Sequence, residues 1–231
     1  MLSGHTDAVW DICVHENSDL LFSASADGTV KFWKFDENSH SCYHTLSYPS
    51  DGIFPLLSHT LPSFLYLYFL LIIILWSSSV YLPIIFYIAS NAHTPTTLCN
   101  VKTNTDSILI GYNSSVILQA DIETGSILQT IKSPNFTGSP NTHQQINQII
   151  THPILPMAFT AHEDRYIRYF DLRTGECAIS MVAHLDSVSS LAIDPAGSHL
   201  FSGGSPSSIL FFYALMQFHS PFFNLQAMTH L

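Results

Sequence analysis

The side chains that could do chemistry in this chain are its thirteen histidines and seventeen acidic residues. His162, Glu163 and Asp164 are consecutive, and an imidazole beside a carboxylate is a common pairing for general acid–base catalysis. Adjacent residues in a short turn point in different directions, however, so neighbours in sequence do not form a cluster in space. We interpret this triplet as a polar turn with one structural Asp, and we interpret His5 and His184 as structural too.

No other pattern of reactive side chains indicates an enzyme. The sequence has no G-x-S-x-G nucleophile turn, no Gly-rich phosphate loop and no H-E-x-x-H zinc motif. The four cysteines are far apart and form no C-x-x-C pair, so neither a zinc site nor a disulfide framework is expected. They are Cys13, Cys42, Cys99 and Cys177. We expect a non-catalytic protein with no metal and no cofactor.

The charge balance argues against a nucleic-acid partner. The net charge is −10 and the chain has only seven basic residues, with no run of them. A nucleic-acid-binding protein needs a basic face to neutralise phosphates. Charged residues make up 10% of the chain, and the deficit is local, because residues 52–101 and 195–231 contain none.

An internal repeat organises the chain around these residues. Residues 4–33 align without a gap on residues 183–212, so that His5 meets His184 and a Leu-Phe-Ser triplet is shared. The His and the aromatic residue that closes the repeat are 28 residues apart in both copies. Such self-similarity at a fixed offset is typical of a protein built from structural repeats.

Two further copies lie between these. "SASADGTVKFWK" at residues 23–34 aligns on "TAHEDRYIRYFD" at 160–171, and a weaker copy is "IGYNSSVILQAD" at 110–121. The closing positions at 34, 121, 171 and 213 are 87, 50 and 42 residues apart. Removing an insertion of about 45 residues from the first interval leaves roughly 40–50 throughout, the period of a four-stranded propeller blade.

Turn residues support strands rather than helices. Asp27-Gly28 separates two β-rich runs and is a hairpin signal, and Thr124-Gly125 and Thr174-Gly175 end two further runs in the same manner. A helical period of three to four residues is not sustained in these segments, so an all-β fold is expected.

The repeat resembles the WD-repeat family of β-propellers. In that family a His from the loop before the blade, a Ser or Thr on its second strand, an Asp in the following turn and a Trp on its third strand form a buried hydrogen-bonded set. The resemblance implies a full set in the first repeat and partial sets in two later ones. Their members are His5, Ser23, Asp27 and Trp33, then Thr160 and Asp164, then His184 and Ser202. The predicted fold class is an all-β WD-repeat β-propeller, incomplete at about four blades and interrupted by an apolar insertion.

A closer resemblance is to the striatin family. "SGHTDAVW", "SASADGTVKFW" and "QINQIITHPILPMAFTAHEDRYIRYFDLRTGE" look like its C-terminal propeller, over about residues 1–47 and 98–209. The resemblance implies a non-enzymatic scaffold in a signalling assembly that holds a type 2A protein phosphatase and germinal-centre kinases. The coiled coil and the calmodulin-binding segment of that family have no counterpart in this sequence, so their partners are not expected.

The apolar insertion is long enough to cross a membrane. Residues 64–89 are uncharged, and a 30 Å hydrocarbon core needs about 20 apolar residues. A single crossing would separate the first blade from the others, and no basic flank sets an orientation. The Phe, Leu, Ile, Tyr and Ser composition favours read-through of non-coding sequence in the gene model, with a membrane span or a long loop as alternatives. The predicted domains are a first blade at 1–47, the insertion at 48–97, three further blades at 98–213 with the last truncated, and an aberrant tail at 214–231.

Propellers usually bind partners on the face that carries the loops before the first strands and the turns after the second strands. By analogy, the positions expected on this face are Ala8, Trp10, Gln145, Asn147, Glu163, Ser187 and Ser189. Trp10 is the natural anchor, because Trp dominates interface energetics. The alternative is that Trp10 packs against the loop of the next blade.

The sequence therefore predicts a cytoplasmic WD-repeat scaffold whose partners are proteins. Two alternatives remain open. One is a different WD-repeat adaptor, and the other is a membrane-anchored protein that uses residues 64–89 as a span, so membrane contact depends on whether the insertion is real.

Overall fold

The computed structural model describes residues 2–16, 18–36, 39–49, 93–134, 145–204, 208–214 and 225–228. The chain divides into two compact units, residues 1–47 with 93–231, and residues 48–92. The second unit lies almost wholly outside the described residues, and so does the predicted membrane-spanning stretch at 64–89. In the part that is described, no helix has the length and apolar character needed to cross a membrane.

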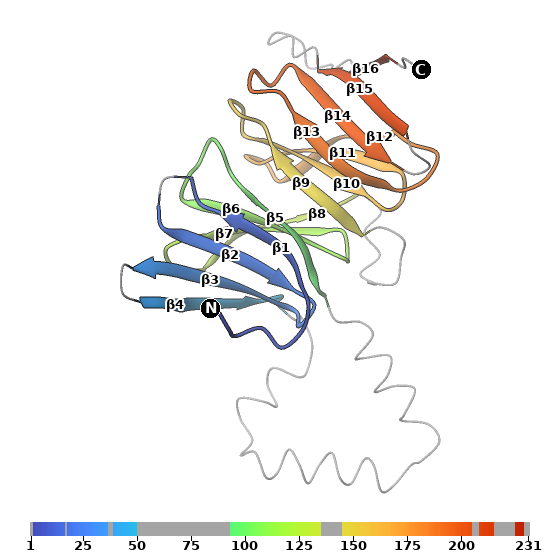
Figure 1. The fold of residues 1–231 in the computed structure, drawn as a ribbon. Coiled ribbons are helices and arrows are strands. Elements are labelled where there is room, and N and C mark those ends of the chain that lie inside the picture. The colour runs from blue at the N-terminus through green and yellow to red at the C-terminus, as the bar shows by residue number, and fades with distance from the viewer. Residues whose placement is uncertain are drawn as a thin grey trace, which may run out of the picture. The chain divides into compact units, whose positions relative to one another are not determined.

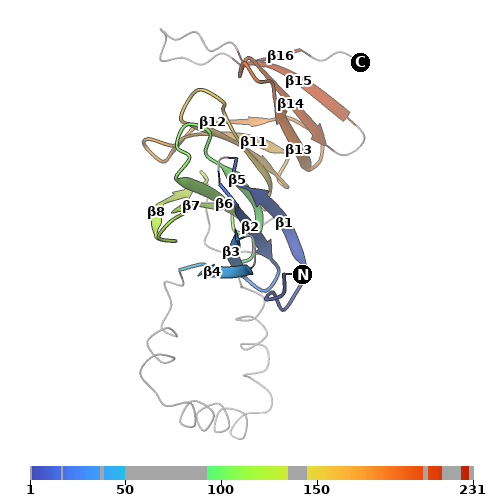
Figure 2. The same cartoon turned by 60° about the vertical axis from the view of Figure 1, so that its left-hand side comes forward.

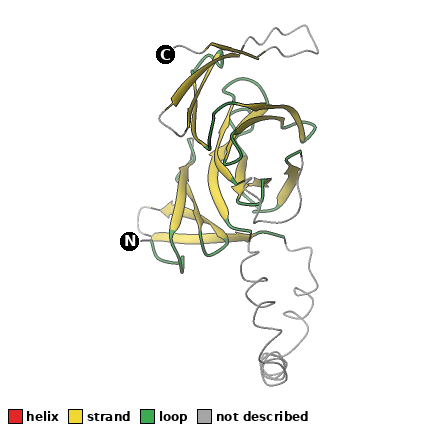
Figure 3. Cartoon of the chain, turned by 90° about the vertical axis from the view of Figure 1, so that its right-hand side faces the viewer, coloured by secondary structure: helices red, strands yellow, loops and turns green. Residues whose placement is uncertain are grey.

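The described residues of the first unit form sixteen strands and no helix (Figures 1 and 3). The strands are β1 (Val9–Val14), β2 (Leu20–Ser25), β3 (Thr29–Asp36), β4 (Ser39–Ser47), β5 (Pro95–Asn100), β6 (Ser107–Tyr112), β7 (Val116–Asp121), β8 (Ile127–Lys132), β9 (Ile146–Thr151), β10 (Met157–His162), β11 (Tyr166–Asp171), β12 (Glu176–Val182), β13 (Val188–Ile193), β14 (His199–Gly204), β15 (Ser208–Ala214) and β16 (Leu225–Met228).

These strands form four sheets of four strands, each an antiparallel meander in chain order. We call them blade I (β1–β4), blade II (β5–β8), blade III (β9–β12) and blade IV (β13–β16). In blades I, II and III the first strand contacts the first strand of the next blade, so that β1, β5, β9 and β13 follow one another side by side (Figures 1 and 2). This arrangement confirms the prediction of an all-β propeller with four blades.

The predicted turns are formed as their sequences require. Gly28, between β2 and β3, has φ +83°, and Gly175, between β11 and β12, has φ +73°. A residue with a side chain is strained at such angles, whereas glycine adopts them freely. These two glycines therefore let the chain reverse between antiparallel strands that pair with each other, β2 with β3 and β11 with β12.

Two strand bounds differ from the predicted domain limits. The first strand of blade II begins at Pro95, inside the range that we assigned to the insertion. Strand β16, in the predicted tail, pairs with β15 and gives blade IV a fourth strand. The remaining domain limits stay predictions.

The blades are joined by apolar clusters and by side-chain bonds to the main chain. One cluster joins blades II and III, and a second joins blades III and IV. Across the blade boundaries the N–H of Leu98 donates to Asp11 Oδ2 at 2.7 Å, and the N–H of Leu191 donates to Gln148 Oε1 at 2.6 Å. The first strands therefore lie at fixed positions relative to one another, and they carry the loops of the candidate face.

Candidate functional site

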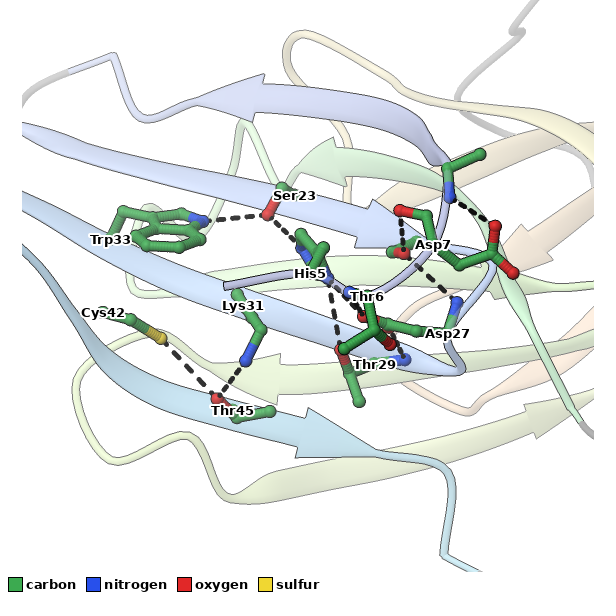
Figure 4. A network of polar contacts seen from close by, with 12 residues as sticks. His5, Thr6, Asp7, Ser23, Asp27, Thr29, Lys31, Trp33, Cys42 and Thr45 are labelled. Carbon is green, nitrogen blue, oxygen red and sulfur yellow. Dashed lines mark hydrogen bonds and ion pairs between the residues drawn. The ribbon is translucent and has the colours of Figure 1, made fainter. Parts of the chain in front are cut away.

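In blade I the structure brings together all four residues of the predicted hydrogen-bonded set (Figure 4). Nδ1 of His5 lies 2.9 Å from Asp27 Oδ2, and its Nε2 lies 2.7 Å from Ser23 Oγ. The indole N–H of Trp33 donates to the same Ser23 oxygen at 2.8 Å. One neutral imidazole satisfies this geometry if its Nδ1–H donates to Asp27 and its Nε2 accepts from Ser23.

The carboxylate of Asp27 accepts more bonds than the sequence pattern indicated. Thr29 donates to Oδ1 through its hydroxyl at 2.6 Å and its N–H at 3.0 Å, and Thr6 N–H donates to Oδ2 at 3.0 Å. Burial alone would raise the pKa of this carboxyl, but the bonds from Thr29, His5 and Thr6 together hold the pKa of Asp27 well below its ordinary value. Asp27 therefore stays ionised and fixes the loop before β1 onto the turn after β2.

The partial set predicted in blade III is arranged differently. Thr160 bonds to His162 Nε2 at 2.7 Å, while Asp164 forms an ion pair with Arg168 at 2.5 Å. Nδ1 of His162 lies 3.3 Å from Ser115 Oγ of blade II. The imidazole of blade III is thus supplied by its own second strand rather than by the loop before the blade, and it also joins two blades.

The sequence analysis missed His162 and Arg168 as structural partners. The sequence did contain a signal for His162, because this residue lies two positions after Thr160, at the end of the same strand. The triplet interpreted as a polar turn divides accordingly: His162 is fully buried, Glu163 is exposed and Asp164 is half-buried. Since these three side chains lie in different surroundings, their geometry supports no shared acid–base chemistry.

In blade IV, His184 Nε2 lies 2.8 Å from Ser202 Oγ, so the structure brings both predicted members together. Burial lowers the pKa of His184. In blade II the register of this serine is held by Ile110, which has no hydroxyl; Gln119 Nε2 donates to the buried hydroxyl of Ser107 at 3.0 Å, at the opposite end of the second strand. In blades I, III and IV the members of the polar set bond to one another or to neighbouring side chains of the protein.

His152 plays a further structural role at the other end of the blades. Its Nδ1 accepts the N–H groups of Ile154 and Leu155 at 3.0 and 2.9 Å, and its Nε2 donates to the carbonyl of Gly197 in blade IV at 3.2 Å. This pattern requires a neutral ring, because a proton on Nδ1 would face two N–H donors. Burial lowers the pKa of His152, although the Gly197 carbonyl and Asp194 act in the opposite direction.

The lowered pKa of His152 predicts that acid destabilises the protein. The unfolded His binds a proton near pH 6.5 and the folded one does so only at lower pH, so this stability is present above pH about 6.5 and is lost as the pH falls below it. Each unit by which the pKa is lowered corresponds to about 1.4 kcal/mol. We expect the urea midpoint to fall between pH 7.5 and 5.5, and His152→Ala to be less stable at pH 7.5 but less sensitive to pH. An equal pH dependence in both proteins would show that His152 is not responsible.

The candidate face is shaped by one irregularity that recurs in every blade. Each first strand carries an extra residue near its start, where its register with the second strand shifts. Such a bulge re-aims a side chain and often lies beside functional sites. The extra residues are Trp10, Thr96, Asn147 and Ser189. Three of them were predicted on the partner-binding face, and Thr96 was not, because the repeat is weakest in blade II.

Three of these bulged residues line one pocket of about 310 Å³. Its lining residues are Trp10, Thr94, Thr96, Gln145 and Asn147, and we call it the Trp10 pocket. The Thr96 hydroxyl donates to the carbonyl of Ile146 at 2.6 Å, and the Asn147 amide donates to the carbonyl of Val188 at 2.7 Å. The polar wall is therefore held in place by contacts with the next blade, while the Trp10 side chain is 62% exposed.

The other predicted face residues lie around this pocket or on the neighbouring blade. Glu163 is exposed, and its N–H donates to the carbonyl of Gln145 at 2.9 Å. Ala8 is exposed in the loop before β1, and Ser187 and Ser189 belong to blade IV, outside the pocket. The structure thus brings Trp10, Gln145 and Asn147 together but leaves the two serines apart from them.

A larger cavity of about 630 Å³ lies at the opposite strand ends of blades I and II. It is lined by Ser18, Asp19, Leu20, Lys34, Tyr43, Ile122 and Glu123. Tyr43 donates from its hydroxyl to the carbonyl of Ile122 at 2.9 Å, so its polar group already has a partner. Among the described residues, no group of three His, Cys, Asp or Glu side chains could hold a metal ion here or elsewhere.

Comparison with known proteins agrees with this architecture. A family model described as "WD domain, G-beta repeat" matches residues 1–34 and 175–212. The chain is 34% identical to mouse striatin-4 over 209 residues, which cover 90% of this chain and 22% of that protein. It is 36% identical to human striatin-3, over 90% of this chain and 21% of that protein. The chain is similar to striatins over nine tenths of its own length, and it matches the WD-repeat model in two segments.

The likeness extends beyond animals. A striatin homolog of Dictyostelium discoideum is 32% identical over 212 residues, covering 91% of the striatin-like chain and 21% of the homolog. The match covers more of the chain than the motifs alone predicted. Because the chain spans only 21–22% of the length of these relatives, the activities and partners of a whole striatin do not pass to it directly.

Proposed function

We propose that this striatin-like chain is a non-catalytic scaffold that binds another protein through the face around the Trp10 pocket. The observation that carries the proposal is the convergence of three bulged residues from three successive blades on one pocket. An exposed Trp beside hydroxyl and amide groups combines a large apolar contact with hydrogen-bonding capacity. Interface hot spots are enriched in such aromatic anchors.

The chemistry of the pocket favours binding over catalysis. Its lining side chains are an indole, two hydroxyls and two carboxamides, none of which changes its charge near neutral pH. The imidazoles and the carboxylate of the nearby polar sets are already bonded within the blades. A partner would therefore be recognised by shape and hydrogen bonds rather than transformed.

The partner that we propose is a component of a phosphatase–kinase assembly in the cytoplasm. The support is the similarity to striatins, whose family resemblance implies scaffolding of a type 2A phosphatase and germinal-centre kinases. Another WD-repeat adaptor role would use the same face with a different partner.

Trp10→Ala tests the proposed site. We expect the variant to lose affinity for the assembly by at least about 30-fold, because truncating a hot-spot Trp costs about 2 kcal/mol or more. The measurement is co-precipitation of the type 2A phosphatase catalytic subunit with the tagged full chain. Ile154→Ala is the matched control, since Ile154 is 65% exposed on a turn at the other end of blade III.

Thermal unfolding followed by circular dichroism should be the same for Trp10→Ala and the wild type, because most of the Trp10 side chain is exposed. If Trp10→Ala folds normally and captures the phosphatase as well as the wild type does, the Trp10 pocket is not the binding site. If the wild type captures no phosphatase, the assembly is excluded, while binding of other proteins at this face stays a proposal.

A further inference from the structure

Arg165 is the one arginine without an acidic partner among the described residues. Arg168 forms an ion pair with Asp164 of the same blade, and Arg173 forms one with Asp171 at 2.9 Å. Although Arg165 follows Asp164 directly, this carboxylate is bound by two guanidinium nitrogens of Arg168. The Arg165 side chain is exposed, and the described part of the structure gives it no hydrogen bond and no ion pair. Its guanidinium is therefore open to contact from another molecule.

Arg165 also holds a backbone conformation that is unfavourable for a residue with a side chain. Its φ is +76°, in the left-handed region that glycine adopts most easily. The matching turn of blade I has Gly28 at this place, with φ +83°. The two turns are equivalent, because in each the Asp carboxylate accepts the N–H of the residue two positions later, at 3.0 and 3.2 Å. Folding alone favours glycine here, and a strained residue that is kept at such a position indicates a functional constraint.

The turn that carries Arg165 adjoins the Trp10 pocket. The N–H of Glu163 donates at 2.9 Å to the carbonyl of Gln145, a residue that lines this pocket. On its other side, the carbonyl of Arg165 accepts the N–H of Ala183 at 3.0 Å, in the loop before β13. These main-chain bonds fix the turn between blades II and IV. A partner that covers the Trp10 pocket therefore meets Arg165 in the adjoining turn.

The other charged side chains of this face are acidic. Asp7 and Asp186 are exposed in the loops before β1 and β13, and Glu163 is exposed in the same turn as Arg165. In the described part of these loops and of the turns after the second strands, Arg165 is the one arginine or lysine. An acidic side chain of a partner is therefore repelled elsewhere on this face and attracted at one place. A guanidinium binds a carboxylate through two parallel N–H···O bonds, so the contact also fixes orientation.

We propose that Arg165 is a second anchor of the partner-binding face and that it binds the carboxylate of an Asp or Glu side chain on the partner. The inference rests on the proposed function, because it assigns this contact to the protein that covers the Trp10 pocket. Trp10 supplies apolar contact area and Arg165 supplies one charged, directional contact. Trp and Arg are among the residue types most enriched in interface hot spots. The partner therefore presents an acidic side chain next to an apolar one.

Arg165→Gly tests the anchor, because it removes the guanidinium and suits the left-handed backbone. We expect co-precipitation of the type 2A phosphatase catalytic subunit with the tagged full chain to fall at least about tenfold. The thermal midpoint measured by circular dichroism should stay unchanged or rise. Arg165→Lys keeps the charge but loses the planar fork, so capture should lie between the two. Arg173→Ala is the matched control, since Arg173 is an exposed arginine at the opposite strand ends of blade III.

Treating the partner preparation with alkaline phosphatase before mixing separates a carboxylate from a phosphate as the bound group. Capture that survives the treatment supports the carboxylate. Capture that is lost assigns a phosphate to Arg165 and overturns the proposal.

The variants also separate the anchor from the Trp10 pocket. If Trp10→Ala lowers capture and Arg165→Gly does not, the anchor is overturned while the proposed function stands. If Arg165→Gly lowers capture and Trp10→Ala does not, the anchor stands and the pocket is not the binding site. A lower thermal midpoint for Arg165→Gly overturns the anchor, because the arginine is then kept for folding. A wild type that captures no phosphatase overturns it as well, since the assigned partner is then absent.

Discussion

Replacing Phe159 with alanine is expected to lower the free energy of unfolding by about 3–5 kcal/mol. The Phe159 side chain is 2% exposed and packs in the cluster that joins blades III and IV, with its ring centroid 5.2 Å from that of Tyr169. Removing the ring deletes this contact and leaves a cavity that strands on both sides hold open. The measurement is urea unfolding followed by circular dichroism at pH 7.5.

Ile154→Ala is the control for Phe159→Ala. Ile154→Ala also shortens an apolar side chain of blade III, but at 65% exposure it should change stability by less than about 0.5 kcal/mol. If Phe159→Ala cost no more than this control, the two blades would not share a core. A loss near the upper end of the expected range would show that the surrounding strands do not close around the cavity.

Replacing Asp27 with alanine is expected to lower the free energy of unfolding by about 1–3 kcal/mol at neutral pH. The variant removes the acceptor of four hydrogen bonds, two from Thr29, one from His5 and one from Thr6. These donors are then left without their partner in a half-buried position. Asp19→Ala is the control, because Asp19 is an exposed acid of the same blade.

The pH dependence of this loss follows from the direction of the Asp27 shift. Its pKa is lower in the folded protein than the ordinary 3.8, so its contribution is present above that pH and is lost as the pH falls below it. The difference in stability between wild type and Asp27→Ala should therefore stay constant from pH 7 to 5 and shrink below about pH 4. A difference that is already smaller at pH 5 would contradict the hydrogen-bonded, ionised carboxylate.

Local features of the sequence predicted the fold because hairpin geometry is set by neighbours along the chain. The Asp27-Gly28 turn fixes the pairing of β2 with β3, and the spacing from His5 to Trp33 then brings both residues to Ser23. The same reasoning failed in blade III for a local reason as well. In blade III, His162 at the end of the second strand bonds to Thr160, as the histidine from the loop before the blade does in blade I. A repeat alignment compares positions along the chain, so it does not show where an imidazole points.

The candidate face could be predicted only in part. Aligned repeats indicated Trp10 and Asn147, and whether these residues bind a partner stays a prediction. Thr94 and Thr96 were missed because blade II has lost the repeat motif, while the bulge that aims Thr96 into the pocket depends on backbone pairing between β5 and β6. A register shift of this kind leaves no mark in residue types.

The sequence by itself determined the number of repeats, their turns and the polar set of blade I, because each follows from spacing within a few dozen residues. Tertiary structure alone decided which equivalent residues are buried. Ile12 and Ile149 are the same residue type in the same register, and one is 59% exposed while the other is 2% exposed. The difference lies in the preceding blade, which covers Ile149 and has no counterpart beside Ile12 among the described residues. Burial is a property of the neighbour in space, and no pattern within a single repeat can encode it.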